Sequence, residues 1–182
     1  CFNKNVKVIQ YLHNKLTNRI NINKQCKIGQ TTLMLSVRYN TNVEVIQYLC
    51  DTFEDEIDIN KQNKSGHTAL MLAASMNTNV EVIKYLYNTF KDKIDINKQD
   101  NNGNTLFTIA ALNNTNVEVI QYLYNTFKDE INMNKQDNDG QTAFMLEVCF
   151  NSNAEVIQYL YDTFKNTIDI SEDDQTALVL AI

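Results

Sequence analysis

The sequence predicts an all-α solenoid, in which pairs of short helices stack one after another and are joined by tight turn tips. The chain of 182 residues contains four glycines, each 37 positions after the last, at Gly29, Gly66, Gly103 and Gly140. Each glycine precedes a short apolar stretch and then a longer one whose apolar residues recur at spacings of three and four, as on one face of a helix. A fixed period of this size is typical of repeat architectures, whose units bury a common core by stacking.

Each repeat is expected to open with a turn tip and a short first helix. Glycine after polar residues favours a tight β-turn. The second residue after the glycine is threonine in all four cases, namely Thr31, Thr68, Thr105 and Thr142. A threonine there can cap amide groups that the first turn of a helix leaves unpaired. The first helix that follows contains small residues such as Ala73 and Ala74, which let neighbouring helices approach closely.

The second helix of each repeat has a stronger start signal. A hydroxyl residue is followed three positions later by glutamate in four repeats, beginning at Thr41, Thr78, Thr115 and Ser152. This is the pattern of a reciprocal capping box, so it predicts that these residues are N-caps. In one second helix, the apolar residues at spacings of three and four are Val80, Ile83, Leu86, Tyr87 and Phe90. We expect them to form a stripe that packs against the adjacent repeats.

The repeats are expected to form a single domain over residues 1–182, because a repeat array is one elongated domain however long it is. Full repeats are assigned to 26–62, 63–99, 100–136 and 137–170, with partial repeats over 1–25 and 171–182. The sequence opens inside one repeat and closes inside another, which predicts a fragment of a longer chain.

The formal net charge of -6 argues against nucleic acid and membrane as main partners, because both attract clustered Lys and Arg. The charge is unevenly distributed: residues 1–29 carry six basic and no acidic residues, whereas residues 141–182 carry one basic and seven acidic residues. This gradient is either variation among solvated side chains or a sign that the two ends meet oppositely charged neighbours.

The cysteines indicate a reducing compartment. Cys1, Cys26, Cys50 and Cys149 lie in different registers without a CxxC pair, which favours neither zinc binding nor disulfides. No apolar run approaches the roughly 18 residues of a membrane span, and no signal peptide is recognisable. We therefore expect an intracellular protein, in the cytoplasm or also in the nucleus.

No group of residues predicts catalysis. The two histidines, His13 and His67, fall in different repeats and different registers, and no glycine-rich phosphate loop occurs. We expect no enzyme activity, no cofactor, no metal site and no small-molecule substrate.

The order of turn, Gly-x-Thr, short helix, turn and Val-Glu-Val-Ile resembles the ankyrin repeat over the whole chain. Residues 66–74 match the family pattern G-x-T-P-L-H-x-A-A, and residues 94–97 match A-D-V-N. The histidine of the pattern is replaced by Met34, Met71, Thr108 and Met145, so the usual hydrogen bond from threonine to histidine cannot form. The period exceeds the usual one of about 33 residues by nearly one helical turn. A longer second helix is therefore expected to carry Phe53, Phe90, Phe127 and Phe164 into the core.

The resemblance implies that another protein binds on the concave side. The residues implied at the ends of the first helices are Arg38, Tyr39, Ser75, Met76, Leu112, Asn113, Cys149 and Phe150. Those implied at the tips, mostly as hydrogen-bonding groups, are Ile28, Gln30, His67, Asn104 and Gln141. Each repeat thus offers a large apolar residue, Tyr39, Met76, Leu112 or Phe150. These residues either form an exposed interaction stripe or fold down into the core.

We predict a non-enzymatic scaffold that holds another protein in its concave groove by surface complementarity. The alternative is a structural or assembly element that contacts neighbouring subunits through its ends.

Overall fold

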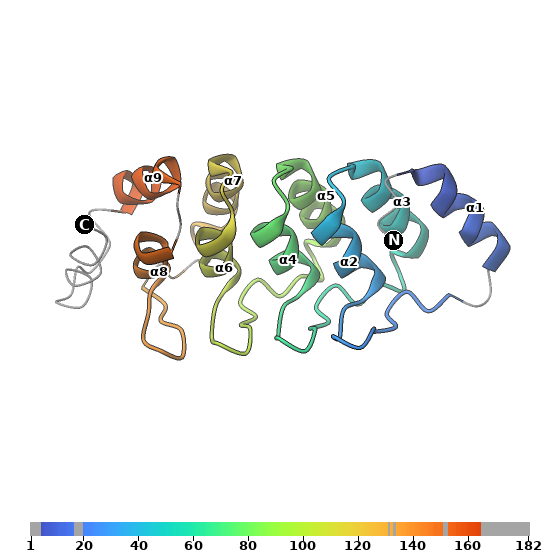
Figure 1. Cartoon of the computed structure of the whole chain (residues 1–182), viewed down its shortest axis with the longest axis horizontal. Helices are drawn as coiled ribbons and strands as arrows, with labels where there is room; N and C mark the ends of the chain where they lie inside the picture. Colours follow the sequence, from blue (N-terminus) through green and yellow to red (C-terminus); the bar gives the residue numbers. More distant parts are fainter. Residues whose placement is uncertain (1–4, 17–19, 131, 133, 151–152, 165–182) are drawn as a thin grey trace. The chain divides into compact units, whose positions relative to one another are not determined.

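The structure is a computed structural model that describes residues 5–16, 20–130, 132, 134–150 and 153–164. The chain divides into two compact units, Cys1–Asp95 and Ile96–Ile182. All regular secondary structure in the described residues is helical, which confirms the predicted fold class (Figure 1). The partial repeat assigned to residues 171–182 lies outside the described residues.

In the first unit, α1 spans Val6–Leu16, and two helix pairs follow it. The first helices of these repeats are α2 (Thr32–Tyr39) and α4 (Ala69–Met76), and the second helices are α3 (Val43–Phe53) and α5 (Val80–Phe90). α2 packs against α4, α3 packs against α5, and α1 packs against α3. Like elements of successive repeats therefore lie side by side, and the turn tips point to one side (Figure 1).

The second unit repeats this arrangement with α6 (Leu106–Asn113), α7 (Val117–Phe127), α8 (Ala143–Phe150) and α9 (Ala154–Phe164). α6 packs against α8, and α7 packs against α9.

The second helices end at the phenylalanine that the longer period adds to each repeat. Phe53, Phe90 and Phe127 are buried, as predicted, and burying such a side chain contributes about 1.5–3 kcal/mol. The Phe164 side chain lies outside the described residues. On α5, Ile83 and Leu86 of the predicted stripe are also fully buried, whereas Val80 and Tyr87 are half-buried. Val82, which lies outside the predicted stripe, is fully buried as well.

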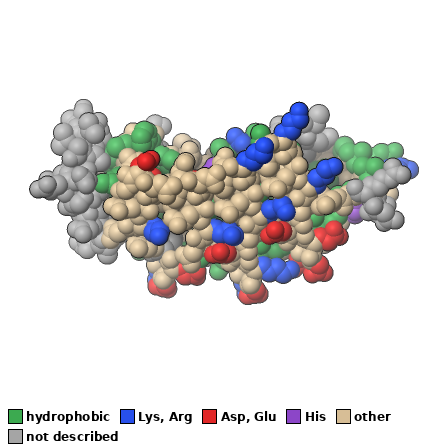
Figure 2. All heavy atoms as spheres, turned by 90° about the horizontal axis from the view of Figure 1, so that it is seen from below, with side chains coloured by type: hydrophobic (Ala, Val, Ile, Leu, Met, Phe, Trp, Pro, Cys, Tyr) green, Lys and Arg blue, Asp and Glu red, His purple; other side chains and the backbone are tan. Residues whose placement is uncertain are grey.

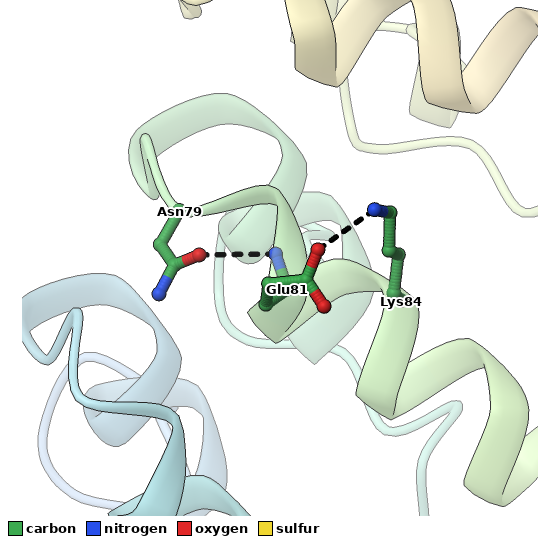
Figure 3. Close-up of polar contacts among 3 residues, drawn as sticks. All are labelled: Asn79, Glu81 and Lys84. Carbon is green, nitrogen blue, oxygen red and sulfur yellow. Dashed lines mark hydrogen bonds and ion pairs between the residues drawn. The ribbon is translucent and has the colours of Figure 1, made fainter.

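The predicted N-caps of the second helices are wrong by one residue. The caps are Asn42, Asn79 and Asn116, whose side chains accept the amide hydrogen of the glutamate two positions on. For Asn79 and Glu81 the distance is 3.1 Å (Figure 3). Asparagine competes well for this role because its short side chain places a carbonyl oxygen near the first free amides.

The first helices carry the predicted threonine caps. Thr31 Oγ1 accepts the Met34 amide at 3.3 Å, and the Thr31 amide donates to Met34 Sδ at 3.4 Å. The same pair of contacts joins Thr68 and Met71. The methionine that replaces histidine thus closes the first turn through its sulfur, a weak acceptor.

Candidate functional site

In three of the four full repeats, the side chain of the first residue holds the turn tip together. Asn63 Oδ1 accepts the amides of Ser65 and His67 at 2.9 and 3.0 Å. Asp100 and Asp137 make equivalent contacts. All four glycines have positive φ, from 78° to 86°, as the predicted turns require. In the first full repeat this position is Cys26, whose thiol is a much weaker acceptor.

Neighbouring tips within each unit are in backbone contact. The Lys64 amide donates to the Ile28 carbonyl at 3.3 Å, and the Asn138 amide donates to the Asn102 carbonyl at 2.8 Å. A Cβ atom at Gly29 would lie 2.6 Å from the Lys64 nitrogen, so only glycine allows this approach. The tips therefore form a continuous, closely spaced surface within each unit.

Three of the residues implied for binding are buried, which corrects that expectation. Gln30 and Asn104 are 2% and 7% exposed, because the residue after each glycine closes the turn with its carbonyl and is enclosed by its surroundings. Asn104 Nδ2 donates to Asp100 Oδ2 at 3.2 Å within the same tip. Ser75 is buried, and its hydroxyl donates to the Leu72 carbonyl of its own helix. None of these side chains is available to a partner in this structure.

The remaining tip residues are accessible. Ile28 is exposed, and His67 and Gln141 are half-buried. Figure 2, which views the chain from the side of the tips, shows mainly backbone and uncharged polar side chains there.

The large apolar residues of the first unit are exposed. Tyr39 and Met76, 40% and 45% exposed, are the last residues of α2 and α4, which pack against each other. We call this pair the apolar stripe of the first unit. A single exposed apolar side chain is ordinary, but neighbouring exposed apolar side chains indicate an interaction surface. The structure thus decides between the exposed and the core alternatives for these two residues.

In the second unit the corresponding residues differ. Phe150, the last residue of α8, is 66% exposed, whereas Leu112 of α6 is half-buried. Asn113 and Cys149 are exposed. Of the two large apolar residues at these positions of the second unit, Phe150 alone is exposed. Whether any of these residues binds a partner stays a prediction.

Arg38 lies beside the apolar stripe and has one interaction among the described residues. Its guanidinium stands over the Tyr39 ring, 5.0 Å from the ring centroid. The Nε atom is buried and has no hydrogen-bond acceptor. The side chain as a whole is half-buried, so the guanidinium is held in place without an ion pair.

Asparagine side chains join adjacent repeats through hydrogen bonds, which the sequence did not lead us to expect. Asn77 Nδ2 donates to the carbonyls of Val37 and Asn40 at 2.7 and 3.1 Å, and Asn79 Nδ2 donates to the Thr41 carbonyl at 2.9 Å. The Val37 and Asn40 carbonyls lie at the end of α2, where they have no partner within the helix, and the Thr41 carbonyl lies between α2 and α3. The recurrence of two asparagines before each second helix was the available signal.

Two side chains on second helices, Cys50 of α3 and Tyr85 of α5, have strongly raised pKa values. Burial, and then the charges of Asp51 and Glu54, raises the pKa of the Cys50 thiol to about 12, which makes it unreactive at neutral pH. Burial and a hydrogen bond to Asp51 raise the pKa of Tyr85 to about 12. No group of three or more potential metal ligands occurs in the part of the chain that the structure describes.

A cavity of about 250 Å³ lies within the second unit, lined by Leu106, Phe107, Leu123 and Phe127 among others. The described lining residues include two charged ones, Glu130 and Lys135, and neither histidine nor cysteine. The lining hydroxyl of Thr105 caps α6 by accepting the Thr108 amide at 3.3 Å. None of the described helices is both long and apolar enough to cross a membrane.

A family model described as "Ankyrin repeats (3 copies)" matches residues 1–100, 54–137 and 107–182. No curated protein matches the chain.

Proposed function

Because the chain belongs to the ankyrin-repeat family, whose members are generally protein–protein interaction modules, we propose that it is a non-enzymatic scaffold that binds another protein. The binding surface is the concave side implied by the family, formed by the tips and the ends of the first helices. The mechanism is surface complementarity without a cofactor.

The observation that carries this proposal is the exposed apolar stripe, Tyr39 and Met76. The two residues end neighbouring helices at the same position of the repeat, so one partner segment can contact both. Tyrosine and methionine are enriched at interfaces, where they supply large contact areas. Phe150 offers a separate anchor in the second unit.

The test is quantitative affinity capture with the full chain, followed by mass spectrometry. A variant with Tyr39→Ser and Met76→Ser is expected to lose the captured partner. The control variant, Tyr161→Ser, removes an exposed aromatic residue from a second helix and is expected to keep it. Capture of the same proteins in equal amounts by all three chains would contradict the proposal.

The second candidate is an assembly element that contacts neighbouring subunits, and α1 favours it. This helix has no buried residue, and four of its apolar residues are exposed, namely Val8, Tyr11, Leu12 and Leu16. An apolar helix face of this kind often marks an interaction surface. In this case sedimentation velocity should show concentration-dependent association of the full chain that Tyr11→Ser with Leu12→Ser abolishes.

A further inference from the structure

The two segments that contain the apolar stripe carry charges of one sign. In the first unit, the segments 26–42 and 63–79 run from a tip, through a first helix, to the cap of the second helix. They contain Lys27, Arg38 and Lys64 and no aspartate or glutamate. In the half of Figure 2 that shows this unit, the charged side chains visible near the upper edge are Lys and Arg, and toward the lower edge Lys and Arg lie among Asp and Glu.

The acidic residues nearest in sequence are already engaged or lie on the second helices. Glu81 follows the second segment, and its carboxylate pairs with Lys84 at 2.7 Å (Figure 3). Glu44 occupies the same position in the first turn of α3, where the helix dipole favours a negative charge. The corresponding segments of the second unit differ, since they contain Asp100, Asp137, Asp139 and Glu147 and no Lys or Arg.

Arg38 is the charge best placed to contact a ligand on the stripe. It precedes Tyr39 in the last turn of α2 and stacks on the Tyr39 ring. Within the described residues its side chain has neither an ion pair nor a hydrogen bond that a ligand would have to displace. A carboxylate bound there would gain charge-assisted hydrogen bonds from a guanidinium whose position is already fixed.

We propose that the first unit recognises an acidic segment of its partner, in which a carboxylate side chain lies beside large apolar ones. This inference rests on the proposed scaffold function and names the chemistry of the bound segment. Arg38 and Lys27 attract the carboxylates, and Tyr39 and Met76 contact the apolar side chains. Packed helices are about 8–10 Å apart, and an extended polyproline II chain rises about 3.1 Å per residue with three residues per turn, so side chains three positions apart share a face. The two apolar residues of the segment are therefore about three positions apart.

A peptide fits this surface better than nucleic acid does. Phosphate recognition along a strand relies on several closely spaced cations. Here the two segments contain three basic residues, Lys27, Arg38 and Lys64. Lys27 and Lys64 occupy the same position of successive repeats, one in each. The surface combines these few cations with an apolar stripe, which suits a mixed acidic and apolar segment.

The test is a display library of random peptides of about twelve residues, a length that spans several repeats when extended. It is selected on the full wild-type chain and, in parallel, on the Tyr39→Ser, Met76→Ser variant. Peptides retained by the wild type alone are expected to contain more Asp and Glu than Lys and Arg, beside two apolar residues about three positions apart. Equal or greater numbers of basic residues would overturn the inference and leave the scaffold function standing. If every selected peptide binds the wild type and the Tyr39→Ser, Met76→Ser variant equally, or if none is selected, the scaffold function is contradicted, and with it this inference.

The affinities of the best selected peptides are then measured by fluorescence anisotropy. Arg38→Gln is expected to weaken binding about five- to tenfold, and Arg38→Lys by less, because lysine keeps the charge and loses the planar donors. The control Lys91→Gln removes one exposed positive charge at the end of α5 and is expected to change binding by less than about twofold. Equal effects of Arg38→Gln and Lys91→Gln would overturn the role of Arg38. Competition by single-stranded DNA, lost in Arg38→Gln, would instead indicate phosphate recognition.

Discussion

Replacing Asn77 by alanine tests whether side-chain amides hold neighbouring repeats together. Asn77 is 2% exposed, and its Nδ2 donates to the carbonyls of Val37 and Asn40 in the preceding repeat. Its Oδ1 accepts the Asn79 amide at 2.9 Å. The alanine variant leaves two carbonyls and one amide without these partners. A buried unsatisfied group costs about 1–3 kcal/mol, and partial entry of water reduces the sum, so we expect a loss of about 3 kcal/mol.

The assay is urea unfolding of the full chain, followed by far-UV circular dichroism. The matched control is Asn88→Ala, which removes the same side chain from an exposed position on α5 and should change stability by less than about 0.5 kcal/mol. Because repeat arrays can unfold in more than one step, hydrogen exchange of the α2 amides provides a local measurement. Exchange should accelerate there in the Asn77→Ala chain.

Equal losses in Asn77→Ala and Asn88→Ala would refute this reasoning. Asn77→Asp provides a second test, because an ionised carboxylate has the same shape but cannot donate to the two carbonyls. We expect this variant to be less stable than Asn77→Ala at neutral pH. Its stability should recover partly as the pH falls through the pKa of the introduced carboxyl, since the protonated acid can donate one hydrogen bond. A pH-independent difference between the two variants would contradict the donor role.

Gly29→Ala is expected to reduce stability more than Gly140→Ala, because both glycines have positive φ but a Cβ at Gly29 would also approach the Lys64 nitrogen. The strain of the left-handed conformation alone is about 1–2 kcal/mol, and equal shifts of the urea midpoint would argue against close stacking of these tips. Cys26→Asn should raise the free energy of unfolding by about 1 kcal/mol by supplying the missing acceptor of the first tip, and an unchanged midpoint would show that this acceptor contributes nothing. The pKa of the buried Cys50 thiol is raised from 9.0 to about 12. The protonated thiol therefore contributes fully to the free energy of unfolding below about pH 9, and this contribution is lost as the pH rises toward 12. The urea midpoint should fall over that range. Iodoacetamide at mildly alkaline pH should label the exposed Cys26 well before Cys50, and equal labelling by peptide mass spectrometry would contradict the burial of Cys50.

The repeat itself could be predicted because its signals are local. A glycine that needs positive φ, a threonine at the start of a helix and apolar residues spaced by three and four act within one repeat. The period also predicted that Phe53, Phe90 and Phe127 are buried, since an added turn continues the apolar face of the helix. The capping box was misplaced because threonine and asparagine are adjacent before each second helix, and both are good N-caps.

The candidate site was harder to predict than the fold. The sequence placed Gln30 and Asn104 at the tips, but it could not show that neighbouring residues enclose them. Nor could it decide whether Tyr39 and Met76 are exposed, because both alternatives fit a residue at the end of a helix. The unpaired Arg38 guanidinium had no sequence signal at all.

The sequence by itself determined the order, length and type of the elements and the family, because these depend on contacts within about one repeat. The tertiary structure decided which side chains are buried, which donors reach the preceding repeat and which apolar residues remain in water. These properties depend on how one repeat stacks on the next, and Asn77 shows the reason: its partners, Val37 and Asn40, lie 40 and 37 positions earlier in the chain. Only stacking brings them within hydrogen-bond distance.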